Sequence, residues 1–150
     1  MESEIYAYFA LIGTDLSPEE VTEKVGIKPS KTWKIGDLIH SKATIRKKYN
    51  GWRVDSQLSK SDDLESHIKS VMEQLQPGWL SLVELCKHCK VEISCVIYYR
   101  SGSIPAIHFD KYIVEKIHQL NAAIDVDFYV LPEDRAVKTA STQAKPASAG

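Results

Sequence analysis

Three cysteines and one histidine come nearest to the residue types and spacing of a metal site. They lie in the run Cys86-Lys87-His88-Cys89 and at Cys95. Thiolates and an imidazole are good ligands for tetrahedral zinc. However, Cys86 and Cys89 share one face of a predicted helix from which His88 points away, and Cys95 lies on the apolar side of a predicted strand. We therefore expect buried or half-buried thiols, and neither a metal nor another cofactor.

Positive charge is the second feature that could do chemistry, because it is concentrated between Lys24 and Arg53. This window holds nine basic residues against one acid, Asp37, whereas the rest of the chain holds 10 basic and 19 acidic residues. Separated charge of this kind creates a directional field that favours an anionic partner. The side chains expected to make the contact are Lys31, Trp33, Lys34, Arg46, Lys47, Lys48, Trp52 and Arg53.

Two kinds of partner fit this basic window. A protein with an acidic surface is the first, because complementary charge raises association rates and selects partners. Single-stranded nucleic acid is the alternative, since Trp33 or Trp52 could stack on bases while lysines neutralise phosphates. The chain lacks the aromatic, glycine-containing signature of RNA-recognition strands, and its isoelectric point near 6.5 is low for a dedicated nucleic-acid binder. The sequence leaves open whether Trp33 and Trp52 lie in the core or at the surface.

Catalysis has little support from the remaining motifs. None of the five histidines lies beside a serine or cysteine in a glycine-flanked turn that would mark a nucleophile. The glycines stand singly between elements, so no phosphate-binding loop is present. Asp125 and Asp127 alternate on one predicted strand and, with Tyr129, indicate a solvated acidic sheet surface. We expect no catalytic residue, although an enzyme whose site is assembled from distant residues stays an alternative.

Length and composition indicate one folded domain. The 150 residues are 43% hydrophobic, which is enough for a single core. We expect an α+β domain over residues 1–134 and a disordered, low-complexity tail over 135–150. No apolar run approaches a membrane span, the first residues are acidic, and three cysteines suit a reducing compartment. These features predict a cytoplasmic protein without membrane contact.

The amino-terminal elements that must position these residues have clear signals. The apolar and aromatic run Ile5–Ile12 predicts a strand that is covered on both faces and lies centrally in a sheet. Ser17, Pro18 and Glu20 supply a helix start with a capping box, and Gly26 supplies the helix end. This helix has a narrow apolar face that can cover a sheet.

Two further strands are predicted over 31–39 and 50–58, with the basic link 41–48 as an exposed hairpin. A long helix should begin at Asp62, because apolar residues then recur at helical spacing as far as Leu75. The remaining predicted elements are a helical stretch ending near Cys86, strands over 91–99, 104–109 and 124–130, and a helix capped by Asp110.

The predicted order of elements is β-α-β-β-α-β followed by a further β-α-β. Its first part has the order of a ferredoxin-like sandwich, so we expect an α+β fold with a largely antiparallel sheet and helices packed on it. The order of the strands within the sheet and the oligomeric state stay open.

Five short runs along the chain carry a family resemblance. They are Ile27-Lys28-Pro29-Ser30, Lys34-Ile35-Gly36-Asp37, Gly51-Trp52-Arg53-Val54, Leu64-Glu65-Ser66-His67, and the closing run from His108-Phe109-Asp110 to Asp127-Phe128-Tyr129. Over most of residues 5–131 the chain resembles a bacterial family catalogued as domain of unknown function 4279. The resemblance implies an α+β domain and supplies no catalytic residue. It also implies that Pro29 fixes a turn, Gly36 a backbone bend and Trp52 a core anchor.

These features predict a small non-catalytic module that binds another protein through its basic hairpin. A regulatory or immunity-like role would suit such a module by analogy alone. Single-stranded nucleic-acid binding through the same surface is the alternative, and an enzyme with an unrecognised site is less favoured.

Overall fold

One five-stranded sheet forms the framework of the protein. The computed structural model describes residues 3–132, and the sheet within them has the strand order β2-β3-β1-β4-β5. Neighbouring strands are antiparallel except β4 and β5, which run parallel. The fold is therefore mixed α+β with a mostly antiparallel sheet, as predicted. The strands are β1 (Glu4–Ile12), β2 (Lys31–Trp33), β3 (Gly51–Asp55), β4 (Lys90–Tyr99) and β5 (Ala123–Val130).

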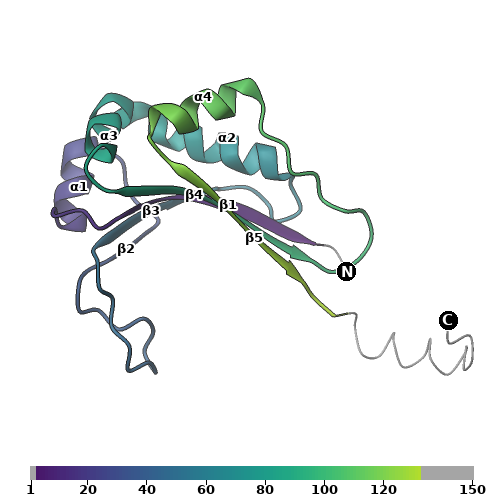
Figure 1. The fold of residues 1–150 in the computed structure, drawn as a ribbon, viewed down its shortest axis with the longest axis horizontal. Helices are drawn as coiled ribbons and strands as arrows, with labels where there is room; N and C mark the ends of the chain where they lie inside the picture. Colours follow the sequence, from purple (N-terminus) through teal and green to yellow (C-terminus); the bar gives the residue numbers. More distant parts are fainter. Residues whose placement is uncertain (1–2, 133–150) are drawn as a thin grey trace, which may run out of the picture.

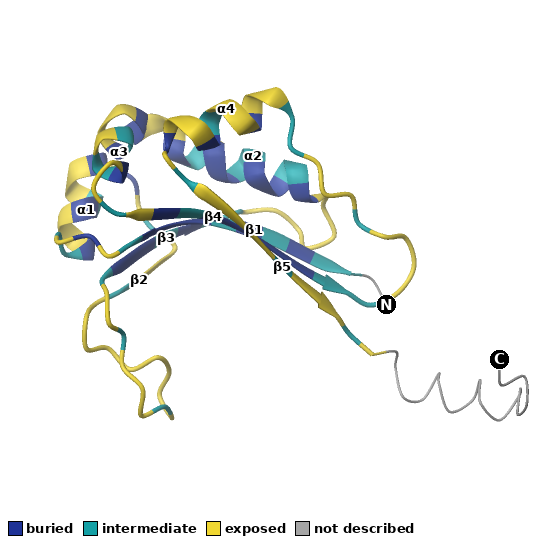
Figure 2. Cartoon of the chain, viewed as in Figure 1, coloured by how far each residue is buried: buried dark blue, intermediate teal, exposed yellow. Residues whose placement is uncertain are grey.

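Within residues 3–132 the helices pack on one face of this sheet, and none of them covers its other face (Figure 1). The buried hydrophobic core lies between these helices and the strands β1, β3 and β4 (Figure 2). No helix within residues 3–132 is long and apolar enough to cross a membrane. The helices are α1 (Pro18–Val25), α2 (Leu64–Leu75), α3 (Trp79–Cys86) and α4 (Lys111–Gln119), with a 3-10 turn η1 (Gln76–Gly78) between α2 and α3.

β1 is the central strand, as predicted, but only one of its faces is covered by helices. Ala7, Phe9 and Leu11 point toward the helices and are fully buried. Tyr6 and Tyr8 point the opposite way and are half-buried. The prediction of a strand covered on both faces is wrong, because all the helices in the described part of the chain pack on the same side.

The helix starts follow local capping signals. The Ser17 hydroxyl accepts the Glu20 N–H at 3.2 Å, and the Glu20 carboxylate accepts the Ser17 N–H at 3.1 Å, which completes the predicted capping box of α1. Gly26 ends this helix with a φ of 70°. α2 begins one residue later than predicted, because Asp63 and not Asp62 accepts a backbone N–H of the first turn, at 2.7 Å.

The largest difference from the prediction lies at the start of the segment 34–50, which we call the basic loop. The predicted strand over 31–39 ends at Trp33, and the basic loop then extends away from the body on the uncovered side of the sheet (Figure 1). One isolated bridge joins Leu38 and Arg46 inside it. Its apolar side chains are mostly exposed, so their alternation has no surface to bury and does not produce a strand.

Two other predicted elements differ in extent. β3 ends at Asp55, so the strand predicted over 50–58 is too long, and residues 104–109 form no strand. The predicted tail over 135–150 and the ends of the predicted domain 1–134 lie outside the described residues.

Candidate functional site

The face of the sheet opposite the helices carries several of the predicted binding residues. Ala10 of β1 pairs with Arg53 of β3 on one side and with Glu92 of β4 on the other. Side chains alternate along a strand, so Arg53 and Glu92 share this face. We call this surface the open face. Its side chains are Tyr6 and Tyr8 (β1), Lys31 and Trp33 (β2), Arg53 and Asp55 (β3), Glu92, Ser94, Val96 and Tyr98 (β4), and Asp125, Asp127 and Tyr129 (β5).

The end of the open face formed by β2 and β3 is basic. Lys31 lies opposite Arg53 in the ladder between these strands. The guanidinium carbon of Arg53 is 3.7 Å from the ring centroid of Tyr8 on the next strand, which is a cation–π contact. Arg53 Nε also bonds the Asp55 carboxylate. The ring and the carboxylate together hold the Arg53 charge in place on the sheet surface.

Trp33 belongs to the same basic end and is half-exposed. A methyl group added at Gly51 would fall within 1.9 Å of the Trp33 indole, so the indole rests directly on the Gly51 backbone. The Lys47 ammonium lies 4.6 Å from the centroid of a Trp33 ring. The basic loop is therefore in contact with the sheet at this point, and Lys31, Trp33, Lys47 and Arg53 form one surface.

The end of the open face formed by β4 and β5 is acidic. Asp125 pairs with Ser94, and Asp127 pairs with Val96. The Ser94 hydroxyl donates to Glu92 Oε1 at 2.6 Å. Desolvation, with added repulsion from Asp125 and Glu92, raises the pKa of Asp127 above its usual value. The three carboxylates therefore act on one another, and the predicted acidic sheet surface is present.

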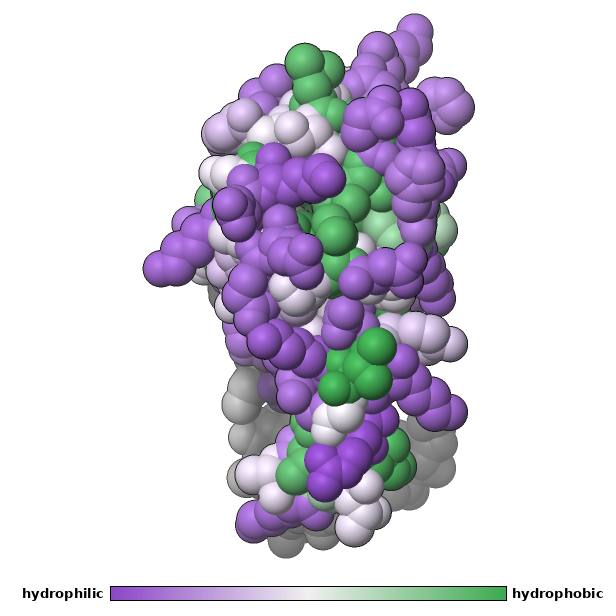
Figure 3. Space-filling view, turned by 90° about the vertical axis from the view of Figure 1, so that its left-hand side faces the viewer, coloured by the Kyte–Doolittle hydropathy of each residue, from purple (hydrophilic) through white to green (hydrophobic). Residues whose placement is uncertain are grey.

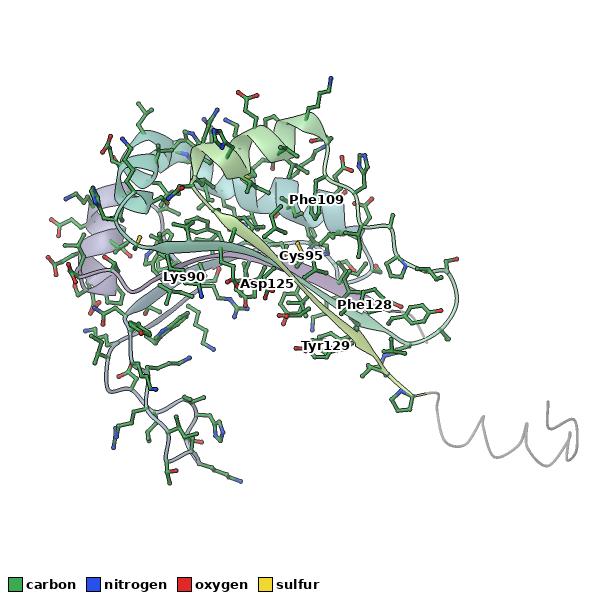
Figure 4. The ribbon with its side chains drawn as sticks, viewed as in Figure 1. Lys90, Cys95, Phe109, Asp125, Phe128 and Tyr129 are labelled. Carbon is green, nitrogen blue, oxygen red and sulfur yellow. The ribbon has the colours of Figure 1, made fainter. Side chains whose placement is uncertain are left out.

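Tyrosines lie between and beside the two charged ends. Tyr6 and Tyr8 are stacked with ring centroids 6.4 Å apart, and Tyr98 and Tyr129 are stacked at 5.0 Å. Desolvation, assisted by Tyr98, raises the pKa of Tyr6 above its usual value, so this phenol stays neutral. Figure 4 shows Tyr129 on the side of the sheet away from the helices. Such rings offer a partner flat apolar faces together with hydrogen-bonding hydroxyls.

The sequence reasoning missed the two tyrosines of β1 as surface residues, although a signal for them was present. Tyr6 and Tyr8 occupy alternate positions, whereas the intervening positions are fully apolar. That period of two is typical of a strand with one wetter face.

Three other predicted binding residues lie in the basic loop. Lys34 makes an ion pair with Glu19 of α1, and the Arg46 guanidinium donates to the Gly36 carbonyl at 2.8 Å. Both side chains therefore brace the loop. Lys48 is exposed. Hydrophilic residues surround small apolar patches on the side of the molecule that carries α1 and the basic loop (Figure 3).

Trp52 is not part of this surface, which corrects its inclusion among the contact residues. Its side chain is fully buried, and its ring meets Phe9 edge-on with centroids 6.2 Å apart. Its indole N–H donates to the Thr22 hydroxyl of α1 at 3.0 Å. The structure places Trp52 in the core, as the family resemblance implied.

The cysteines are free thiols that belong to the core and its margin. Burial raises the pKa of Cys86 and of Cys95 to about 12, so both stay protonated near neutral pH. Cys89 is half-buried, and its thiol donates to the Leu85 carbonyl at 3.4 Å. Cys95 points toward the helices (Figure 4). Within residues 3–132, no group of three His, Cys, Asp or Glu side chains could hold a metal ion.

A serine–histidine pair lies where α2 meets β1. Ser56 Oγ is 2.7 Å from Nδ1 of the fully buried His67, and His67 Nε2 is 3.0 Å from the Ser59 carbonyl. A carbonyl only accepts, so Nε2 carries the proton and Nδ1 accepts from the Ser56 hydroxyl. Ser56 Oγ in turn accepts the Ala7 N–H at 3.2 Å. Each polar atom of the pair is bonded within the protein, which indicates a structural role.

An open hollow of about 600 Å³ lies between the start of α2 and the segment 101–106. Its polar lining consists of serine hydroxyls and the Asp63 carboxylate, which already caps α2. The lining contains no histidine, cysteine, lysine or arginine. It therefore offers no pair of nucleophile and base.

The architecture and the open face define a small α+β domain with oppositely charged ends on its uncovered sheet face. Over residues 3–131 the sequence matches the family described as domain of unknown function (DUF4279). The chain belongs to this family, which confirms the resemblance carried by its short runs. Comparisons with curated proteins and with solved structures gave no match.

Proposed function

We propose that this domain is a non-catalytic protein-binding module, and that its contact surface is the basic loop together with the basic end of the open face. The observation that carries the proposal is the convergence of Lys31, Lys47 and Arg53 around the half-exposed Trp33. An aromatic anchor surrounded by cations is suited to a partner with an acidic surface. A regulatory or immunity-like use of this surface stays a prediction.

The division of charge across the sheet favours a folded protein over a nucleic acid. A nucleic-acid strand that crossed the open face from β2 to β5 would bring its phosphates against Glu92, Asp125 and Asp127. A protein can instead carry acidic groups opposite the basic end and leave the acidic end free. Single-stranded nucleic acid is the second candidate. The Arg53 guanidinium, which lies over the Tyr8 ring, and the Trp33 indole could each stack on a base.

We also propose that the fold is a ferredoxin-like sandwich extended by α4 and β5. The order β2-β3-β1-β4, with β1 antiparallel to both of its neighbours, supports this reading. β5 then extends the sheet next to β4. The basic loop replaces what would be a short hairpin between β2 and β3.

Reversing two loop charges tests the protein-binding proposal. The double change Lys47→Glu and Lys48→Glu is expected to weaken binding of the acidic partner by about tenfold or more, because Lys47 lies over the Trp33 ring and Lys48 is exposed in the same loop. Stability should change by less than about 0.5 kcal/mol, since neither side chain is buried. The measurement is quantitative affinity capture from cell extract, followed by titration of each purified protein that the wild type retains.

A matched control carries the same change in net charge on the helix layer, through Lys87→Glu and Lys111→Glu. This control should retain the same proteins as the wild type, because Lys87 is the C-cap of α3 and Lys111 begins α4, and both helices pack on the opposite side of the sheet from the basic loop (Figure 1). Equal retention by the loop variant and the control would remove the proposal.

Tryptophan emission tests the nucleic-acid candidate. Trp33 is half-exposed, whereas Trp52 and Trp79 are buried, so bound bases would quench Trp33 selectively. We expect labelled single-stranded DNA and RNA to cause no quenching at physiological salt. Quenching that weakens as salt rises and disappears in Trp33→Phe would make nucleic-acid binding the function of this surface.

A further inference from the structure

The two edges of the sheet differ in how well they are protected. β2 forms one edge and is three residues long, and it ends where the basic loop begins. β5 forms the other edge and is eight residues long, with a register to β4 that continues without a bulge. It contains neither proline nor lysine. Short length, bulges, proline and charged side chains are the usual devices that keep an edge strand from pairing with another chain. In β5 only Asp125 and Asp127 can serve this purpose.

The side chains of β5 that point to the helix side are only partly covered. Their neighbours on β4, Ile93, Cys95 and Ile97, are all fully buried. The corresponding β5 row is much more exposed, and Figure 2 shows β5 exposed along most of its length. Within residues 3–132 the helix layer therefore covers β4 fully and β5 only in part. The exposed fractions are 41% for Ile124, 38% for Val126, 41% for Phe128 and 72% for Val130.

On the open face β5 carries Asp125, Asp127 and Tyr129, and its two carboxylates favour some pairing partners over others. A second copy of the chain, paired antiparallel about a two-fold axis centred on Val126, would set Asp125 against Asp127 of that copy. Centring the axis on Asp127 would set that residue against itself. Like charges directly opposite each other destabilise a pair of strands. Cations opposite Asp125 and Asp127 would instead stabilise the pair of strands. The nearby Glu92 carboxylate adds to the negative charge that these cations would meet.

We propose that β5 accepts an extended segment of a partner protein as a sixth strand, with apolar side chains alternating with lysine or arginine. The apolar side chains would lie beside Ile124, Val126 and Phe128, and the cations would lie beside Asp125 and Asp127. Main-chain hydrogen bonds to the free edge supply affinity in this mode of recognition, and alternate side chains supply selectivity. This surface is at the opposite end of the sheet from the basic loop, so it goes beyond the proposed function.

The test uses a blocked, fluorescently labelled peptide in which Lys and Val alternate over the length of β5. Saturable binding to the full chain is expected, with slower amide hydrogen exchange over 124–130. A peptide of the same composition with separate Lys and Val blocks should bind about tenfold more weakly, because it cannot match both rows. Two further peptides carry N-methyl groups on one or the other set of alternate residues. At least one of them should lose binding, because its donors to β5 are gone.

Charge reversal on the protein completes the test. Asp125→Lys with Asp127→Lys should weaken binding of the Lys-Val peptide by about tenfold or more and create binding of an alternating Glu-Val peptide. The melting temperature should stay close to that of the wild type, since Asp125 is exposed and Asp127 is only partly buried on an edge strand. Lys47→Glu with Lys48→Glu should leave peptide binding unchanged, so this proposal and the proposed function can fail separately.

Three results would overturn the proposal. Equal binding of the unmodified and both N-methylated peptides would show charge attraction without strand pairing. Unchanged binding by the Asp125 and Asp127 variant would remove the acidic row from recognition. Protection of 124–130 that grows with protein concentration in the absence of peptide would identify a second copy as the occupant.

Discussion

Replacing Trp52 with alanine is expected to destabilise the folded protein by about 3–5 kcal/mol. Trp52 is fully buried, its ring packs edge-on against Phe9, and its indole N–H is bonded to Thr22. The change removes a large apolar surface from the core and leaves a cavity between α1 and the sheet. The measurement is the free energy of unfolding in guanidinium chloride, followed by circular dichroism.

Trp33→Ala is the matched control, because the two tryptophans lie on neighbouring strands. Trp33 is half-exposed and rests on the Gly51 backbone under the Lys47 ammonium. Its loss should cost less than about 1 kcal/mol, since no closed cavity forms. Similar losses for the two variants would contradict the assignment of Trp52 to the core and Trp33 to the surface.

Trp52 lies in the core and Trp33 at the surface, and the reason the sequence could not assign them is the pairing of their strands. In the ladder between β2 and β3, Trp52 lies opposite Thr32, and Trp33 lies opposite Gly51. The residues of one opposed pair share a face, and the next pair occupies the other face. Both tryptophans lie in the same basic window of the sequence. Which of them is buried depends on the register of β2 and β3 and on which face of the sheet the helices cover.

Local signals predicted the helices well and the basic loop poorly. The capping box of α1 and the Asp110 cap of α4 act within one turn, so a short stretch of sequence contains the whole device. Over 31–39, alternating apolar residues predicted a strand, yet Ile35 is 65% exposed. A strand needs a neighbour and a surface to cover, and these come from distant parts of the chain.

The cations of the candidate site could be predicted from the sequence, but the way its tyrosines and carboxylates come together could not. Clustering along the chain was enough to identify Lys31, Lys47 and Arg53, because these cations are close in sequence. The tyrosines and carboxylates of the open face come from strands far apart in sequence, and only the strand order brings Tyr8 beneath Arg53. Which face the helices leave uncovered is a property of the whole fold.

Folding stability is expected to fall as the pH drops below about 6.5, because the folded protein holds His67 neutral. Desolvation lowers the pKa of His67 from its usual 6.5 and outweighs the opposing effects of the Ser59 carbonyl and of Asp62 and Asp63. Protonation at Nδ1 would also reverse the bond with Ser56, so that the Ser56 hydroxyl hydrogen loses its acceptor. The unfolded chain takes up this proton more readily, so the stabilisation is complete above 6.5 and is lost as the pH falls toward the lower pKa of the folded state. The slope is at most about 1.4 kcal/mol per pH unit for one proton.

Urea unfolding at several pH values between 7 and 5 measures this loss, and two variants isolate its cause. His67→Gln removes the titrating group, so its stability should be lower at pH 7 but nearly constant across the window. Ser56→Ala should cost about 1–3 kcal/mol at pH 7, because the Ala7 N–H loses its acceptor and Nδ1 its donor. The cap at Asp63 holds the pKa of that carboxyl below 3.8, so its own stabilising effect is lost only at lower pH. A slope in His67→Gln as steep as in the wild type would show that another group causes the acid sensitivity.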